Sequence, residues 1–262
     1  MVTIDKYVRV QSLEEAYELN QVKNSRIVGG MLWIKTGSNR IKNAIDLSNL
    51  NLNTIEEDDE QFNIGAMVTL RDIETNESLN AYTNGAIANS VKDIIGVQFR
   101  NMATVGGSIW GRFGFSDVLT VFMALDSYVE LYKGGIIPMA EFVSMKHDRD
   151  ILVRIIVKKT PINVAYSSMR NQRTDFPVIA CATSVINGTY RAVIGARPSK
   201  AKLTIDETNI LSEINDSTIK SFANYVADAT PTSSNLRGSA EYRTQLIKVL
   251  TERNIKKMEG IS

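Results

Sequence analysis

The spacing of apolar and polar residues divides the chain into short strands and helices. Residues 7–10, which read YVRV, predict a short strand, and residues 26–28, which read RIV, predict a buried strand. Between them, Ser12 followed three positions later by Glu15 forms a capping box, and residues 13–20 continue with apolar side chains at helical spacing. The pattern predicts an opening β-α-β unit, which lacks the glycine fingerprint of a Rossmann fold and the motif of a P-loop.

The middle of the chain predicts a mixture of strands and short helices. The acidic cluster 56–60 is expected to be a solvated hairpin or loop tip. Thr69 is placed to cap a helix toward Asp72, and the apolar run 118–125 predicts a buried helix. Other helical residues are expected at 86–94, and strands at 44–47, 62–68, 128–132 and 151–158.

The pattern restarts after Thr160 and Pro161, which predicts a domain boundary near residue 160. A strand, a helix from about Phe176, a strand at 190–195 and then helices to the end are expected. Strands and helices that are mixed without regular alternation indicate an α+β fold.

Composition narrows the classes of function. The 262 residues are 44% hydrophobic and 23% charged, which is ordinary for a globular protein, and 30 basic against 29 acidic residues leave a formal charge of +1. No charge excess recommends a nucleic-acid partner. The N-terminus does not resemble a signal peptide, and no apolar run reaches the roughly 20 residues that a membrane-spanning helix needs.

The chain has one cysteine, Cys181, and one histidine, His147. One thiol excludes an internal disulfide and an iron–sulfur cluster held by this chain alone, and it favours a cytoplasmic location. His147 stands in a very polar stretch and is expected to be a solvated loop residue, so triad catalysis and a zinc site are not expected. If the protein takes part in chemistry, a bound cofactor is expected to carry it.

Two glycine pairs, Gly29-Gly30 and Gly106-Gly107, each follow an extended segment. Glycine lets backbone N–H groups approach an anion closely, so two such loops could hold the two phosphates of a dinucleotide. Residues 98–109, which read QFRNMATVGGSI, resemble the Q-x-R-N-x-A-T-x-G-G-N-I signature of the FAD-binding subunits of molybdenum hydroxylases.

Further resemblances to this family follow in the same order along the chain. Residues 28–30 look like its first pyrophosphate loop, A-G-G-T-D, and residues 64–70 look like its I-G-A-x-x-T-L segment. Ser116-Asp117 and residues 236–243, which read LRGSAEYR, match two later motifs. Met31 and Leu32 replace the usual Thr-Asp, which removes two polar side-chain contacts to the cofactor. Ser108 replaces the usual Asn, which keeps a hydroxyl and loses the amide.

The resemblance implies a fold and a site. It implies a two-part FAD-binding region of the vanillyl-alcohol-oxidase-like type at residues 1–160, with subdomains at about 1–55 and 56–160, and a smaller C-terminal α+β domain at 161–262. It implies FAD as cofactor and no catalytic or metal-binding residue in this chain. The residues that it implies for cofactor binding are Ile27, Val28, Gly29, Gly30, Met31, Leu32, Trp33, Ile94, Ala103, Thr104, Val105, Gly106, Gly107, Ser108, Asp117, Leu152 and Arg170.

The resemblance also implies a role. The chain would be the electron-transfer subunit of a xanthine dehydrogenase-like enzyme, with a molybdopterin-binding large subunit and a [2Fe-2S] small subunit as partners. Electrons from the small subunit would pass through FAD to NAD⁺ or another acceptor. Two alternatives stay open: a free-standing FAD-dependent oxidoreductase, and a non-catalytic scaffold whose flavin site has decayed.

Overall fold

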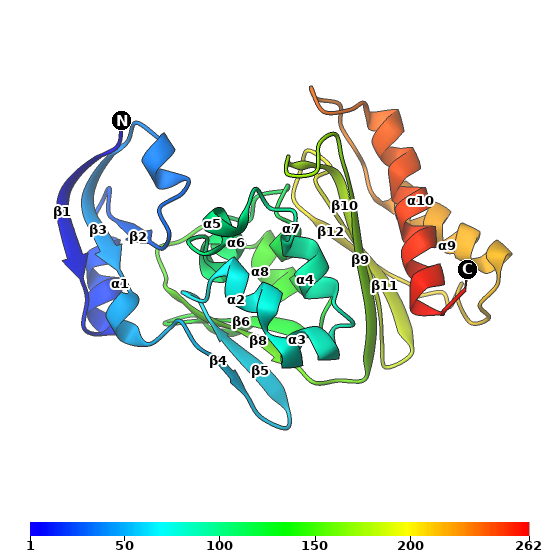
Figure 1. Ribbon diagram of the computed structural model, residues 1–262, viewed down its shortest axis with the longest axis horizontal. Helices are drawn as coiled ribbons and strands as arrows, with labels where there is room; N and C mark the ends of the chain where they lie inside the picture. The colour runs from blue at the N-terminus through cyan, green and yellow to red at the C-terminus, as the bar shows by residue number, and fades with distance from the viewer. Residues whose placement is uncertain (262) are drawn as a thin grey trace.

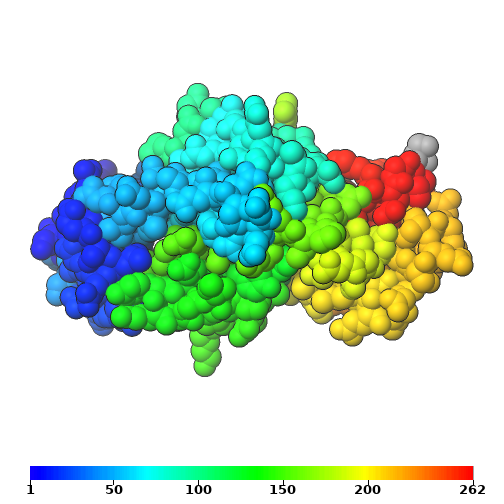
Figure 2. All heavy atoms as spheres, turned by 90° about the horizontal axis from the view of Figure 1, so that it is seen from below, coloured from blue at the N-terminus to red at the C-terminus, as the bar shows by residue number. Residues whose placement is uncertain are grey.

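The computed structural model describes residues 1–261, and this part of the chain folds into three β-sheets that follow one another in space in their order along the sequence (Figure 1). The space-filling view shows an elongated molecule with the N-terminal residues at one end and the C-terminal helices at the other (Figure 2). The α+β class predicted from the sequence is confirmed.

The N-terminal sheet is parallel and has the strand order β1-β3-β2. The predicted β-α-β unit is present, and helix α1 begins where the sequence indicated, because Ser12 Oγ accepts a hydrogen bond from the Glu15 amide at 3.1 Å. The elements are β1 (Thr3–Arg9), α1 (Leu13–Gln21), β2 (Arg26–Val28), the 3-10 helix η1 (Ile34–Thr36), β3 (Arg40–Asp46) and the 3-10 helix η2 (Ser48–Leu50).

The central sheet is antiparallel, with the order β4-β5-β8-β6-β7 and several short helices beside it. Thr69 and Asp72 form the predicted helix cap, and helix α7 is buried along its whole length, as its apolar sequence predicted. The strands are β4 (Ile55–Glu57), β5 (Gln61–Gly65), β6 (Ser127–Leu131), β7 (Gly135–Pro138) and β8 (Leu152–Lys158). The helices are α2 (Leu70–Thr75), α3 (Glu77–Tyr82), α4 (Ala86–Val91), α5 (Val97–Arg100), α6 (Val105–Trp110), α7 (Asp117–Met123) and α8 (Met139–Ser144).

The C-terminal sheet has the order β12-β11-β10-β9 and is covered on one face by two long helices (Figure 1). Its elements are β9 (Ile162–Arg170), β10 (Pro177–Ile186), β11 (Thr189–Gly195), β12 (Lys202–Ile205), α9 (Asp216–Ala229) and α10 (Ala240–Met258).

The helix predicted from about Phe176 is wrong, because residues 177–186 form strand β10. Both faces of β10 are buried: Ala180 and Ala182 pack into the central core, and Ile179 and Cys181 face α9 and α10. A strand buried on both faces has no alternation of apolar and polar residues, so periodicity could not distinguish it from a buried helix.

Candidate functional site

Two adjoining cavities lie where the N-terminal sheet meets the central helices. The larger has a volume of about 670 Å³ and extends toward the β9–β10 connection, and the smaller, about 270 Å³, is bordered by residues 148–152. Six residues line both cavities and therefore mark their junction: Arg26, Ile27, Gly29, Thr104, Gly107 and Trp110. The two chambers therefore meet at residues of the two glycine-containing loops.

The first glycine pair lies between the two cavities and leaves its backbone donors free. A Cβ atom on Gly30 would stand 1.8 Å from the Met102 carbonyl oxygen, so glycine is needed for this loop to touch the second one. Met31 follows in the left-handed conformation, with φ of 57°. Within residues 1–261, the N–H groups of Gly29, Gly30, Met31 and Leu32 donate no hydrogen bond. These N–H groups are suited to an anionic ligand.

The second glycine pair lies in the first turn of α6, where the amides are already bonded. The amides of Val105 and Gly106 donate to the carbonyls of Val68 and Ala66 at 2.8 and 2.9 Å. Gly107 N–H donates to Thr104 Oγ1 at 3.1 Å. A Cβ on Gly106 would stand 2.5 Å from the Ala66 oxygen, so this glycine serves the packing of α6. Of the two loops, the first therefore offers the free donors.

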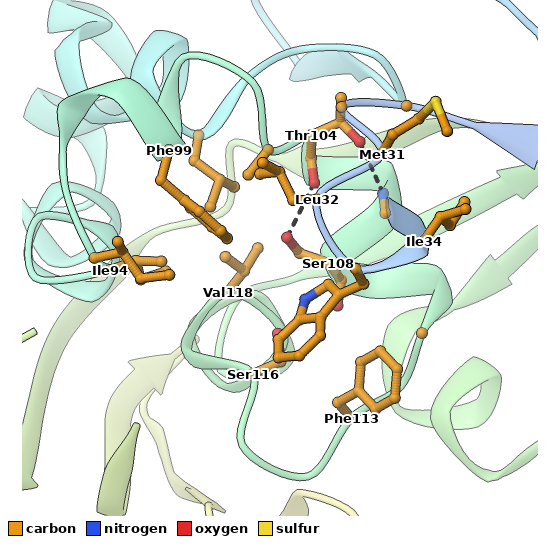
Figure 3. A pocket seen from close by; sticks show the side chains of 18 of the residues that line it. Met31, Leu32, Ile34, Ile94, Phe99, Thr104, Ser108, Phe113, Ser116 and Val118 are labelled. Carbon is orange, nitrogen blue, oxygen red and sulfur yellow. Dashed lines mark hydrogen bonds between the residues drawn. The ribbon is translucent and has the colours of Figure 1, made fainter. Parts of the chain in front are cut away.

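Figure 3 shows how the two loops face the central helices around the larger cavity. Leu32 and Ser108 line this cavity together with Phe99 and Val118, and the Ser108 hydroxyl donates to the Thr104 carbonyl at 3.0 Å. The Ser108 side chain is thus held toward the cavity by its own helix. Most of the wall that these residues build is apolar, as expected for a site that buries an aromatic ring system.

A buried ion pair closes one side of the larger cavity. Arg170 Nη2 donates to Asp117 Oδ1 at 2.7 Å, and the Tyr166 hydroxyl donates to the same oxygen. Burial raises the pKa of Tyr166 well above its usual value, and the Asp117 carboxylate raises it further, so the phenol keeps its proton. Burial lowers the pKa of Arg170, but the adjoining Asp117 carboxylate outweighs this and raises it. Arg170 Nε has no partner within residues 1–261.

Four aromatic side chains from three parts of the chain form a cluster in the wall of the larger cavity. Trp33 lies 5.9 Å from Phe176, ring centre to ring centre and nearly parallel, and 5.8 Å from Phe115. Phe113 stacks on Phe115 at 5.2 Å. Of these four side chains, only Trp33 is among the site residues predicted from the sequence. The three phenylalanines lie in connecting segments, where no periodic pattern points to them. Their position beside two glycine pairs in the fold was the missing information.

The structure brings most of the sequence-predicted site residues to the cavities. The larger cavity is lined by Ile27, Gly29, Gly30, Met31, Leu32, Trp33, Ile94, Ala103, Thr104, Gly107, Ser108, Asp117 and Arg170. Gly106 and Leu152 line only the smaller cavity. Val28 and Val105 line neither, because both side chains are in the hydrophobic core. Arg26, at the junction of the cavities, was predicted only as part of a buried strand. The burial prediction is wrong at this residue, because its side chain is exposed at the edge of the sheet.

The remaining candidate groups lie elsewhere. His147 and Cys181 line neither cavity, and Cys181 is fully buried. In the part of the chain that the structure describes, no cluster of three or more histidine, cysteine or carboxylate side chains is suited to a metal ion. Among the helices of residues 1–261, none is both long and apolar enough to cross a membrane.

Comparisons with known proteins find relatives that match nearly the whole chain. Over 96% of this chain, the sequence is 25% identical to the glyceraldehyde dehydrogenase medium chain of Sulfolobus acidocaldarius, covering 97% of that protein. It is 24% identical to the 6-hydroxypseudooxynicotine dehydrogenase complex subunit alpha of Paenarthrobacter nicotinovorans, over 96% of this chain and 93% of that protein.

Solved structures show the same fold. Quinoline 2-oxidoreductase from Pseudomonas putida 86 superposes with a TM-score of 0.87 at 19% identity, covering 97% of this chain and 96% of that one. Reconstituted CO dehydrogenase from Oligotropha carboxidovorans gives 0.86 at 20% identity, covering 99% of both chains. Residues 2–160 match the family described as the FAD binding domain in molybdopterin dehydrogenase, and the chain belongs to this family.

Proposed function

We propose that this protein is the electron-transfer subunit of a cytoplasmic, xanthine dehydrogenase-like molybdenum hydroxylase. The observation that carries the proposal is the pair of cavities joined at a loop with four free backbone N–H groups. Such a junction suits a pyrophosphate, and the chambers on either side suit the two ring systems of FAD. FAD, when bound, supplies the redox chemistry, and the protein holds it and shields it from water.

The residues proposed to hold FAD are the seventeen predicted from the sequence, of which fifteen line one or both chambers. The resemblance implies that Ile94, Leu152 and Arg170 border the flavin. Ile94 and Arg170 line the larger chamber together with the aromatic cluster, and this chamber is proposed for the isoalloxazine. Leu152 lines only the smaller chamber, which is proposed for the adenine, so its expected place beside the flavin is not kept in this assignment. Val28 and Val105 would act from the core, by supporting the two glycine loops. Arg170 is proposed to favour a negatively charged reduced flavin, since its guanidinium lies in the wall of the larger chamber.

The domain organisation is also proposed. Residues 1–160 would form the FAD-binding domain, with subdomains at about 1–55 and 56–160, and residues 161–262 the C-terminal domain. Support comes from the family match, which ends at residue 160. The buried pair of Asp117 and Arg170 would then link the two domains at the cofactor, because its partners come from α7 and β9.

The partner subunits are proposed from two observations: the number of cysteines in this chain and the names of two relatives. The chain's single cysteine cannot hold an iron–sulfur cluster by itself, so a [2Fe-2S] cluster in the proposed enzyme would belong to another chain. Two relatives are named as a medium chain and as a subunit of a complex. We therefore propose a [2Fe-2S] small subunit as electron donor, a molybdopterin-binding large subunit as the site of substrate oxidation, and NAD⁺ or another molecule as acceptor.

The test is the visible spectrum of the purified chain, with the released cofactor identified by chromatography. One FAD per chain, together with copurification of molybdenum- and iron-containing subunits from the native source, is the expected result. A protein that stays colourless after incubation with excess FAD would overturn the cofactor part and favour a scaffold. Rapid bleaching of the flavin by a small substrate, with no partner present, would favour a free-standing oxidoreductase.

A further inference from the structure

The charged residues that line the two cavities differ in whether they have partners within the protein. Seven charged residues line them, and the three cations are outnumbered by four carboxylates: Arg26, Arg149 and Arg170 against Asp117, Asp148, Asp150 and Asp175. FAD carries a pyrophosphate with two negative charges, and a positive charge that is free to face it would offset the repulsion from these carboxylates.

Six of these seven residues already have partners in the protein. Arg170 pairs with Asp117, and Arg149 Nη1 donates to the carbonyls of Asn20 and Val22 at 2.7 and 2.9 Å. The three other carboxylates accept backbone or side-chain hydrogen bonds: Asp148 from the Asp150 amide, Asp150 from the amides of Lys133 and Gly134, and Asp175 from the Phe176 amide. These six are committed to holding the walls of the site.

Arg26 is the exception. Within residues 1–261 its guanidinium donates no hydrogen bond and forms no ion pair, and the side chain is exposed. It lies on β2, which is an edge strand of the N-terminal sheet. Arg26 lines both cavities, as Gly29 does, and precedes the four free N–H groups by only a few residues.

We infer that Arg26 is a positioning residue for FAD, whose guanidinium binds the pyrophosphate together with the free amides of the first glycine loop. A guanidinium can donate two hydrogen bonds to a phosphate in a fixed geometry, which a point charge cannot do. Without Arg26, two engaged cations and four carboxylates would surround the dianion. This inference rests on the proposed FAD site and adds to it a residue that the sequence comparison did not include.

The test is titration of the flavin-free full chain with FAD and with riboflavin, followed by calorimetry at several salt concentrations. We expect Arg26→Gln to weaken FAD binding roughly 10- to 100-fold, the usual value of a hydrogen bond to a charged group. Riboflavin has no phosphate, so its affinity should not change. The FAD affinity of the variant should also fall less steeply with added salt. Arg26→Lys, which keeps the charge and loses the fork, should give an intermediate affinity and a wild-type salt dependence.

Lys42→Gln is the matched control, because Lys42 is an exposed cation on the neighbouring strand β3 that lines neither cavity. Like Arg26→Gln, this substitution removes one positive charge, but the variant protein should bind FAD with wild-type affinity. Equal FAD affinity and salt dependence in Arg26→Gln and the wild type would overturn the inference and leave the proposed function standing. An equal loss of riboflavin affinity would also overturn it, by placing the effect at the ring. A wild-type chain that binds no FAD would overturn both.

Discussion

The two glycine pairs look alike in the sequence and differ in the structure. At the first pair, four successive N–H groups have no acceptor and Arg26 has no partner in the described residues. At the second pair, the N–H groups of Val105, Gly106 and Gly107 all have acceptors, and the nearby Asp117 is bound to Arg170 and Tyr166. One region has unmet hydrogen-bonding capacity, and the other has almost none.

This difference indicates that the first glycine pair is suited to binding a ligand and that the second pair supports the fold. Polar groups that line a cavity without partners are satisfied by water or by a ligand, so the first glycine loop is where an anionic ligand would gain most. Groups that are already bonded hold the wall in place and gain little. Changes to the bonded groups and to the tightly packed Gly106 should therefore lower stability whether or not FAD is present. Changes at the first loop should lower FAD affinity and alter the stability of the central and C-terminal parts of the chain much less.

The largest effect is expected at the bonded side, for Asp117→Asn. The neutral amide would leave the guanidinium of Arg170, whose side chain is 8% exposed, without a charged partner. Removing one member of a buried ion pair costs about 3–5 kcal/mol of unfolding free energy. Urea unfolding of the flavin-free chain measures this loss of unfolding free energy. Asp5→Asn breaks the exposed pair of Arg40 and Asp5 and should cost less than about 1 kcal/mol. A similar small loss for Asp117→Asn would mean that the buried pair is not a support.

The second largest effect should distinguish two adjacent glycines. Gly106→Ala would place a Cβ 2.5 Å from the Ala66 oxygen and 2.7 Å from its Cβ, an overpacking that costs about 1–3 kcal/mol. The Cβ of Gly107→Ala would meet only Thr104 Oγ1, at 3.1 Å, and alanine favours a helix by about 0.5–1 kcal/mol. Thermal unfolding without flavin should therefore show a clear loss for Gly106→Ala and little change for Gly107→Ala. Equal losses would contradict the packing role given to Gly106.

At the first loop, Gly30→Ala should reduce FAD binding at least tenfold, or about 1.4 kcal/mol. Its Cβ would stand 1.8 Å from the Met102 oxygen, so the loop must move away from the second one and carry its free amides with it. The measurement is the rise in melting temperature on adding FAD, which depends on the dissociation constant. Wild-type protein and Lys42→Gln should show the full rise. A full rise in Gly30→Ala would show that contact between the loops is not required for binding.

Much of the fold could be predicted from the sequence where local chemistry decides the structure. The caps at Ser12 and Thr69 and the buried run that became α7 are local features, and each is present. Strand β10 could not be predicted, because burial on both faces removed its alternation. The same division holds at the site. Both glycine pairs are visible in the sequence, but the state of their amides is not. At the second pair the amides of Val105 and Gly106 are bonded to the carbonyls of Val68 and Ala66, some 40 residues upstream of α6.

The free Arg26 and the three cavity phenylalanines could not be predicted for a related reason. Arg26 precedes a recognisable motif, but an exposed arginine at the start of a strand is ordinary until its neighbours in space are known. Phe113, Phe115 and Phe176 come together only after the central and C-terminal parts of the chain have folded around the cavity. In each case the missing information was tertiary.

The smallest effect is expected for first-loop variants on the rate at which a reagent labels the Cys181 thiol. Cys181 lies in the core of the C-terminal sheet and its helices, so its labelling reports on a different part of the fold. Burial raises the pKa of this thiol to about 12, so at pH 8 the folded protein holds almost no reactive thiolate. The proton is bound more tightly in the folded chain than in the unfolded one, so this contribution to stability is complete below the ordinary thiol pKa. It is lost as the pH rises toward 12. A thiol reagent at pH 8 therefore reacts only when β10 opens.

The labelling rate at pH 8 then compares the two regions directly. Gly106→Ala should accelerate labelling about tenfold for each 1.4 kcal/mol of stability that it loses, since the population of open molecules rises by that factor. Arg26→Gln and Gly30→Ala should label within about twofold of the wild type, because Cys181 lies in the core between the C-terminal sheet and its helices, and the N-terminal sheet can open without exposing it. Acceleration by these variants as large as that of Gly106→Ala would show that the first loop is part of the same cooperative unit. Its free amides would then belong to a structural contact as much as to a binding site.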